Sequence, residues 1–189
     1  MRSVTYGAAC SLDGFIAASD GAIDWLHYSR DVNQIMKAYW SSIDTILMGR
    51  KTWDDAVGRG GAPESSSSKI RTYVFSRTRR ELASPGAELV RANAGEFVRE
   101  LKSGSGKGIC LMGGGELAQS LFEADVIDEV GMNVHPVLLG AGVPMFLDPC
   151  HRVALELKES RPIDGGCVYS IYRVQHSRNF EKSGRRAQA

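Results

Sequence analysis

The sequence lacks an excess of charge of either sign, since 23 lysines and arginines face 22 aspartates and glutamates for a formal net charge of +1. Proteins that bind nucleic acid or a membrane surface through charge usually carry a basic excess, so we expect neither partner. No apolar run approaches the roughly 18 residues that a membrane span needs. The first ten residues show no signal-peptide pattern. We therefore expect a cytoplasmic protein.

Cysteines are few, and their spacing excludes two common uses. Cys10, Cys110, Cys150 and Cys167 form no CxxC pair and have no histidine at ligand spacing. A disulfide framework and a zinc site are therefore not expected, and we predict buried, reduced thiols. A histidine without partners at ligand spacing, such as His135, is typical of a structural role, so we predict no metal site.

Hydrophobic residues make up 43% of the chain, which is enough to build a globular core. No internal repeat or linker divides the sequence. We expect one domain over residues 1–176 and a disordered, polar and charged tail over residues 177–189.

Short apolar runs alternate with segments of helical periodicity along most of the chain. This order predicts an α/β fold of three layers, with a mostly parallel central sheet and an antiparallel C-terminal edge. A loop is expected at residues 136–144. Strands are expected at residues 4–10, 43–48, 70–75, 108–112, 126–134, 153–157 and 167–174, and helices at 31–40, 53–56, 94–101 and 116–124.

Glycines and polar residues follow three of the expected strands. In open α/β sheets, ligands bind beyond the carboxyl ends of the strands, so all three segments should face one crevice. The residues concerned are Gly49, Arg50, Lys51 and Thr52; Ser76 and Arg77; and Gly113, Gly114, Gly115 and Glu116.

These residue types suit a phosphorylated ligand. A glycine lets backbone come close to a ligand, a helix N-terminus offers free amide donors, and arginine and lysine add positive charge. Each segment alone also fits an ordinary turn with solvated charge. The spacing matches neither the GxGxxG fingerprint nor the P-loop. Their occurrence at three strand ends favours a nucleotide site.

Five segments together resemble known proteins. Residues 11–17 (SLDGFIA), 47–53 (LMGRKTW), 75–77 (FSR) and 112–117 (MGGGEL) resemble the dihydrofolate reductase superfamily. Residues 135–146 (HPVLLGAGVPMF) resemble its branch that contains the riboflavin-biosynthesis reductase domain, the RibD C-terminal domain. The resemblance spans residues 4–174. It implies a dihydrofolate-reductase-like fold, NADPH as cofactor, hydride transfer to a pteridine or pyrimidine, and a homodimer.

The resemblance also assigns cofactor residues. A 2′-phosphate calls for arginine, which agrees with the charges after the second and third strands. Arg50, Lys51, Thr52, Ser76 and Arg77 match positions at the 2′-phosphate end, Gly113, Gly114, Gly115 and Glu116 match the pyrophosphate loop, and Ala8, Ala9, Ile16 and Ala17 match positions near the nicotinamide.

For catalysis, the resemblance points to a carboxylate after a tryptophan-containing loop. Trp25 matches that tryptophan, and Asp31 matches the acid if one residue is inserted; Asp31 is equally typical of a helix start. Asp13 is a second candidate, although aspartates in turns usually cap their own backbone. Trp25, Tyr28 and Asp55 are the expected substrate contacts.

Two departures from the family pattern narrow the expected reaction. The zinc segment of cytidine-deaminase-like domains is absent, so only the reductase half of the bifunctional riboflavin enzyme is expected, with a substrate such as 5-amino-6-(5-phosphoribosylamino)uracil. The acid-anchor sequence of dihydrofolate reductases is also missing, which argues against folate itself. Two alternatives stay open: a non-catalytic NADPH-binding module, and glycines that serve packing alone.

Overall fold

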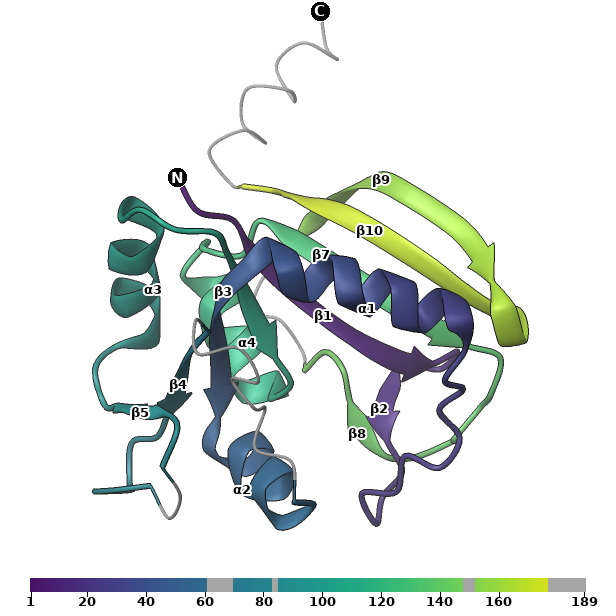
Figure 1. Cartoon of the computed structure of the whole chain (residues 1–189), viewed down its shortest axis with the longest axis horizontal. Helices are drawn as coiled ribbons and strands as arrows, with labels where there is room; N and C mark the ends of the chain where they lie inside the picture. Colours follow the sequence, from purple (N-terminus) through teal and green to yellow (C-terminus); the bar gives the residue numbers. More distant parts are fainter. Residues whose placement is uncertain (61–69, 83–84, 148–151, 177–189) are drawn as a thin grey trace, which may run out of the picture.

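The structure is a computed structural model that describes residues 1–60, 70–82, 85–147 and 152–176 (Figure 1). An eight-stranded sheet runs through it in the order β5-β4-β3-β6-β1-β7-β10-β9. The first six strands of this order are parallel to one another. β10 pairs antiparallel with both β7 and β9. The strands are β1 (Val4–Ser11), β3 (Ile43–Gly49), β4 (Arg71–Phe75), β5 (Glu88–Val90), β6 (Gly108–Met112), β7 (Glu129–His135), β9 (Ala154–Ile163) and β10 (Cys167–Gln175).

Helices cover both faces of the sheet, as expected. The sheet separates two hydrophobic clusters, because successive residues of a strand point to opposite faces. On β6, Ile109 and Leu111 pack in one cluster and Cys110 packs in the other. The first side receives α3 (Ala94–Ser103) and α4 (Gly115–Glu123), and the second receives α1 (Arg30–Ser42) and α2 (Arg50–Gly58). The expected three-layer α/β fold is confirmed.

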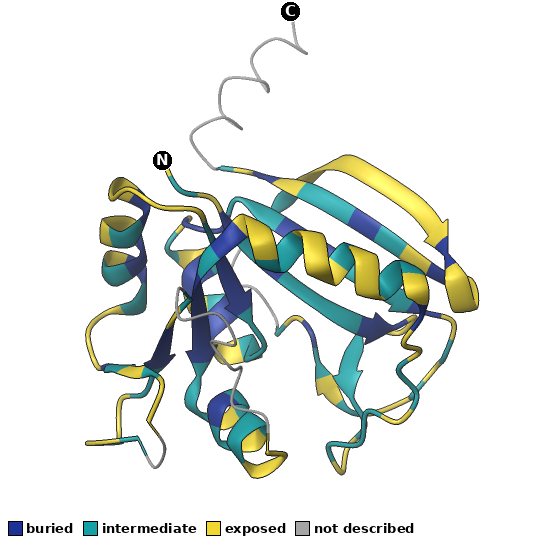
Figure 2. Ribbon diagram, viewed as in Figure 1, coloured by how far each residue is buried: buried dark blue, intermediate teal, exposed yellow. Residues whose placement is uncertain are grey.

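Burial falls off toward the antiparallel edge of the sheet (Figure 2). β9 is exposed along nearly its whole length, whereas β3 and β6 are buried in the centre. The prediction ended this strand at residue 157. In the structure it continues through a polar stretch to Ile163, because an edge strand can pair through its backbone without burying its side chains.

Other boundaries differ for local reasons. β5 was not predicted, since only three residues pair with β4. β7 begins at Glu129 rather than 126, because the amide of Val126 still bonds to Leu121 O at the end of α4. The expected loop at 136–144 contains β8 (Val143–Pro144), which pairs with β2 (Phe15–Ala17).

Three of the expected thiols, Cys10, Cys110 and Cys167, are buried and free. Cys150 and the predicted tail, residues 177–189, lie outside the described residues. Within the described ranges, no helix is long and apolar enough to cross a membrane. Among the same residues, no group of three or more His, Cys, Asp or Glu side chains is arranged to hold a metal ion.

Candidate functional site

The strand register places the three predicted segments side by side. Met48 of β3 pairs with Met112 of β6, and the next residue of β3, Gly49, pairs with Phe75 of β4. All three strands are parallel, so the segments that follow them leave the same edge of the sheet. The strand register is therefore consistent with the prediction that the three segments face the same crevice.

Two of these segments are in direct contact. A Cβ atom built on Gly113 would lie 2.9 Å from Thr52 Cγ2, and one built on Gly114 would lie 3.6 Å from the backbone nitrogen of Gly49. Both glycines of the β6–α4 turn have positive φ, 60° and 77°, a region that glycine enters without strain. The close approach of the two turns therefore requires glycine at Gly113.

The N-termini of α2 and α4, which start at these turns, are capped differently from those of α1 and α3. Ser29 and Asn93 cap α1 and α3 with side-chain oxygens. The N-caps of α2 and α4 are Gly49 and Gly114, which provide no side-chain hydrogen bond. The first-turn amides of α2 and α4 thus keep their donors for another partner, and adjacent helix N-termini of this kind bind phosphates.

Basic side chains surround the two helix starts. Lys51 Nζ lies 3.0 Å from Glu116 Oε1 and joins α2 to α4. The pKa of Glu116 is lowered below its ordinary value, first by the hydrogen bond and charge of Lys51 and further by Arg77 and Arg50. These charges act on one carboxylate, so the predicted cationic residues share one region.

Arg79 is a cation that the sequence analysis missed. Arg50 Nη1 and Arg79 Nη2 both bind Asp54 Oδ2, at 2.8 and 3.1 Å. Asp54 thereby holds two guanidinium groups together beside the start of α2. The basic run at residues 77–80 was the available signal, but only its first arginine was singled out.

Two of the predicted nicotinamide residues, Ala8 and Ala9, lie where β1 separates from β6. β1 pairs with β6 only as far as Gly7, opposite Met112, and from Ala8 onward it pairs with β7 alone. α4 follows β6 on one face and α1 follows β1 on the other, which makes this gap a topological switch point. Ala8 and Ala9 line it on β1. Ile16 and Ala17 are on β2, which contacts β8.

Asp13, Asp31 and Asp55 each have a hydrogen-bond or ion-pair partner within the chain. Asp13 accepts hydrogen bonds from Ser11 Oγ and from the amides of residues 139 and 140, and these bonds lower its pKa. Asp31 accepts the amide of Asp164, 3.2 Å away. Asp55 pairs with Arg59. The partners of these three carboxylates come from different parts of the fold.

Trp25 is partly buried beside His135, which is itself buried, whereas Tyr28 is 69% exposed. The Trp25 ring packs edge-on against the His135 ring, with centroids 5.5 Å apart. Asn133, two residues before His135 on β7, contacts the same imidazole at 3.2 Å. Burial lowers the pKa of His135. Asn133 carried no recognisable sequence signal.

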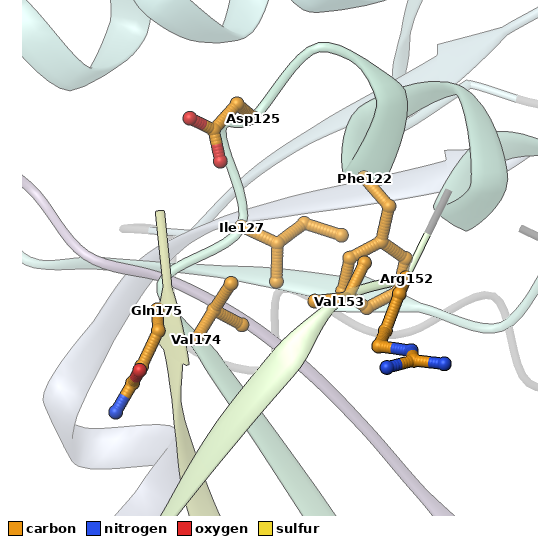
Figure 3. A pocket seen from close by; sticks show the side chains of 7 residues that line it. All are labelled: Phe122, Asp125, Ile127, Arg152, Val153, Val174 and Gln175. Carbon is orange, nitrogen blue, oxygen red and sulfur yellow. The ribbon is translucent and has the colours of Figure 1, made fainter. Parts of the chain in front are cut away.

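The hollow in Figure 3 lies away from this site. Ile127, just before β7, and Gln175, at the end of antiparallel β10, both lie at the opposite end of the sheet. None of the predicted site residues lines this hollow. Its lining residues are Phe122, Asp125, Ile127, Arg152, Val153, Val174 and Gln175.

The fold is that of the dihydrofolate-reductase-like class. The chain belongs to the RibD C-terminal domain family, which matches residues 2–169. The uncharacterized protein YyaP of Bacillus subtilis (strain 168) is 32% identical over 180 residues, covering 90% of this chain and 94% of YyaP.

Two solved structures show the same architecture. A putative riboflavin biosynthesis protein from Shewanella sp. PV-4 superposes with a TM-score of 0.81 at 25% identity, covering 93% of this chain and all of that one. Dihydrofolate reductase from Enterococcus faecalis, crystallised with NADP(H), superposes with a TM-score of 0.63 at 17% identity, covering 92% of this chain and 96% of that one. The second likeness shows the fold alone.

Proposed function

We propose that the chain is an NADPH-dependent reductase that transfers hydride to a small pyrimidine-type or pteridine-type heterocycle. The observation that carries the proposal is the meeting of two uncapped helix N-termini, those of α2 and α4, among basic side chains at one sheet edge. The NADP(H) complex of the Enterococcus reductase, which shares the fold, supports the choice of cofactor.

The residues present fit this cofactor. The amides at the starts of α2 and α4 would hold the pyrophosphate, because both starts carry glycine caps that provide no side-chain hydrogen bond. Arg50, Lys51 and Arg77, with Thr52 and Ser76, would hold the 2′-phosphate end. Bound NADPH supplies the hydride; the protein orients the acceptor and keeps water away.

The nicotinamide end would lie at the gap between β1 and β6, beside Ala8 and Ala9. Small side chains there let a planar ring approach the backbone. A substrate related to 5-amino-6-(5-phosphoribosylamino)uracil is supported by a structure that shares the fold, that of a deaminase/5-amino-6-(5-phosphoribosylamino)uracil reductase from Thermotoga maritima.

The test measures dissociation constants for NADPH and NADH with the wild-type chain and with Arg50→Ala/Arg77→Ala. Loss of one charge-assisted contact costs about 1.5–3 kcal/mol, so NADPH should weaken about tenfold to a hundredfold while NADH changes little. Lys158→Ala, an exposed lysine on β9, is the control. Equal losses for both cofactors would contradict the 2′-phosphate assignment.

A non-catalytic NADPH-binding module is the alternative. It is distinguished by following NADPH absorbance with a panel of pterins, flavin precursors and quinones. Oxidation of NADPH by any of these acceptors supports the reductase. Tight NADPH binding without turnover on the whole panel supports the module, and no thermal shift with NADPH contradicts both, since a ligand of the folded state must stabilise it.

We also propose a homodimer formed through the β9–β10 edge. Leu155, Leu157 and Val168 are 43%, 55% and 41% exposed. Their cross-strand partners, among them Tyr172 and Val174, place all three on one face of the sheet. Leu157→Glu should convert a dimer to a monomer in analytical ultracentrifugation, whereas Leu138→Glu, also exposed, should not. A wild-type monomer would contradict this proposal.

A further inference from the structure

Two backbone amides from a distant loop converge on the carboxylate of Asp13. Gly140 N lies 2.8 Å from Asp13 Oδ2, and Leu139 N lies 3.2 Å from Asp13 Oδ1. Ser11 Oγ, which accepts the amide of Phe15, donates to Asp13 Oδ1 at 2.6 Å. Aspartates in turns usually cap their own backbone. The carboxylate of Asp13 instead joins the β1–β2 turn to a loop that is 126 and 127 residues further along the chain.

The loop that Asp13 binds packs closely against β2. A Cβ atom built on Gly142 would lie 2.2 Å from the carbonyl oxygen of Ala17, so glycine is required for this approach. Directly after Gly142, β8 pairs with β2, and the two strands lie side by side in Figure 1. Residues 139–144 therefore contact both β2 and the turn that precedes it.

β2 lies outside the eight-stranded sheet. It forms a separate two-stranded ribbon with β8, and its three residues are each only partly buried. Ile16 and Ala17, the other two predicted nicotinamide residues, are on this strand. Their position therefore depends on the contacts that hold the β2–β8 ribbon against the rest of the fold.

The charge state of Asp13 suits an acceptor. The hydrogen bond from Ser11 lowers the pKa of Asp13 below its ordinary value, and the amides of Gly140 and Leu139 lower it further. An ionised carboxylate accepts hydrogen bonds on both oxygens and has no proton to give. Asp13 is thus better suited to holding the loop than to donating a proton to a substrate.

We propose that Asp13 is a positioning residue, which fixes the β2–β8 ribbon by binding the 139–142 loop and thereby sets how tightly the nicotinamide end of the cofactor is held. This inference rests on the proposed reductase function and gives Asp13 a role other than catalysis. Asp13 acts through the backbone of the loop and of β2. The adenosine end of the cofactor, at the starts of α2 and α4, does not depend on it.

The first experiment uses calorimetry on the full chain with two ligands. One is NADPH, and the other is 2′-phospho-ADP-ribose, which has the same phosphates and lacks the nicotinamide. The wild-type chain should bind NADPH more tightly than this fragment. Asp13→Ala should weaken NADPH about threefold to tenfold, the scale of one exposed hydrogen bond or two, and should leave the affinity for the fragment unchanged. Equal weakening of both ligands, or of neither, overturns the proposal.

Asp20→Ala is the matched control for Asp13→Ala. Asp20 also precedes a glycine in a turn, but it accepts the nearby amide of Ala22, 2.9 Å away. Its removal should leave the affinities for both ligands unchanged. If Asp20→Ala weakens NADPH as much as Asp13→Ala does, the bond to the distant loop has no special role and the proposal is wrong.

Gly142→Ala tests the contact between the loop and β2. The added methyl group would overlap the carbonyl of Ala17, so this variant should also weaken NADPH and spare the fragment. Gly104→Ala is the control, since a Cβ at Gly104, after α3, would have its nearest atom 3.5 Å away. If Gly142→Ala leaves NADPH binding as it is in the wild type, the ribbon does not carry the effect of Asp13, and the proposal fails.

Asp13→Asn separates positioning from proton donation. The asparagine keeps one acceptor oxygen for the loop amides, so it should retain part of the affinity for NADPH that Asp13→Ala loses. If Asp13→Asn binds NADPH like the wild type and loses hydride transfer, Asp13 is catalytic and the proposal is overturned. A wild-type chain that binds neither ligand contradicts the reductase itself, whereas one that binds both with the same affinity contradicts only this inference.

Discussion

Gly113 and Thr52 approach so closely that no side chain larger than hydrogen fits at Gly113. A Cβ there would lie 2.9 Å from Thr52 Cγ2 and 3.0 Å from Thr52 Oγ1. The contact joins the turn after β6 to the first turn of α2. The geometry of the proposed phosphate site therefore depends on the absence of a Cβ atom at Gly113.

Gly113→Ala should consequently reduce both stability and NADPH affinity. The backbone at φ 60° costs an alanine about 1–2 kcal/mol, and the overlap with Thr52 adds about 1–3 kcal/mol. Chemical denaturation measures the loss. Gly140→Ala is a matched control, since Gly140 has φ 71° and no atom within 4 Å of its built Cβ. Equal losses in the two variants would show that the Thr52 contact contributes nothing.

A second variant separates overlap from backbone strain. Thr52→Ala removes both atoms closest to the built Cβ and leaves only the Thr52 Cβ, 3.5 Å away. The double variant Gly113→Ala/Thr52→Ala should recover the overlap part of the loss and keep the backbone part. Strict additivity of the two single changes would argue against direct contact.

Glu116 was predicted to lie at the cofactor site. Because its negative charge would repel the cofactor's phosphates, its replacement is expected to change the affinity for NADPH. Its carboxylate is ionised, since neighbouring cations lower its pKa, and it binds Lys51 across the helix starts. Glu116→Gln frees Lys51 and removes a negative charge, so NADPH should bind about two to five times more tightly, the scale of an exposed ion pair. Stability should hardly change, because both side chains are at least 70% exposed.

Glu100→Gln on α3 is the control for this variant. If Glu116→Gln alone binds NADPH more weakly, Glu116 contacts the cofactor directly.

The parts of the site that could be predicted are those encoded in short segments. Gly49 to Thr52 and Gly113 to Glu116 combine glycine, charge and a helix start within a few residues, and parallel strands bring such segments to one edge of the sheet. The register confirms that the segments leave this edge together. The antiparallel edge followed from the two final strands, which have no helix between them.

What could not be predicted depends on tertiary contacts. Asn133 lay unremarked within an expected strand, His135 was expected to be structural, and only the fold brings Trp25 onto the same ring. Arg79 is held beside the start of α2 by an ion pair with Asp54, which also binds Arg50. Asp31 was chosen by similarity of position and Asp13 as a second candidate, and each accepts at least one backbone amide from a loop more than a hundred residues away in the chain.

His135 should make the stability of the protein dependent on pH. Burial lowers its pKa below the ordinary value of 6.5, so below pH 6.5 the unfolded chain binds a proton that the folded chain does not. The free energy of unfolding should therefore fall as the pH drops from 6.5 toward the folded-state pKa of His135. His135→Gln should flatten this part of the curve, and Cys167→Ala, which leaves the imidazole in place, should not. An unchanged slope in His135→Gln would assign the dependence to other groups.

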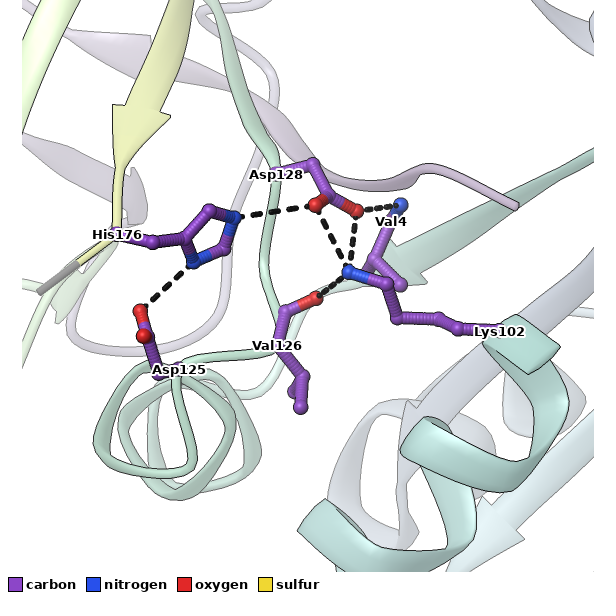
Figure 4. A network of polar contacts seen from close by, with 6 residues as sticks. All are labelled: Val4, Lys102, Asp125, Val126, Asp128 and His176. Carbon is purple, nitrogen blue, oxygen red and sulfur yellow. Dashed lines mark hydrogen bonds and ion pairs between the residues drawn. The ribbon is translucent and has the colours of Figure 1, made fainter. Parts of the chain in front are cut away.

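Lys102 and Asp128 form the network at the opposite end of the sheet (Figure 4). Lys102 Nζ donates to both oxygens of Asp128, at 2.8 and 2.7 Å, and to the carbonyl of Val126 at 2.9 Å. Asp128 also accepts the amide of Val4 and contacts His176 Nε2. The pair thus connects α3, the start of β1 and the end of β10.

Lys102→Met should destabilise the protein by about 3–5 kcal/mol, because it leaves a partly buried carboxylate without its cation. Lys158→Met is the matched control: Lys158 pairs with Glu129 on the surface, where such a pair contributes about 0–1 kcal/mol. Urea denaturation measures both. NADPH affinity of the folded Lys102→Met protein should match the wild type, since the network lies far from α2 and the start of α4. Similar small losses in the two variants would show that solvent screens Lys102 as fully as it screens Lys158.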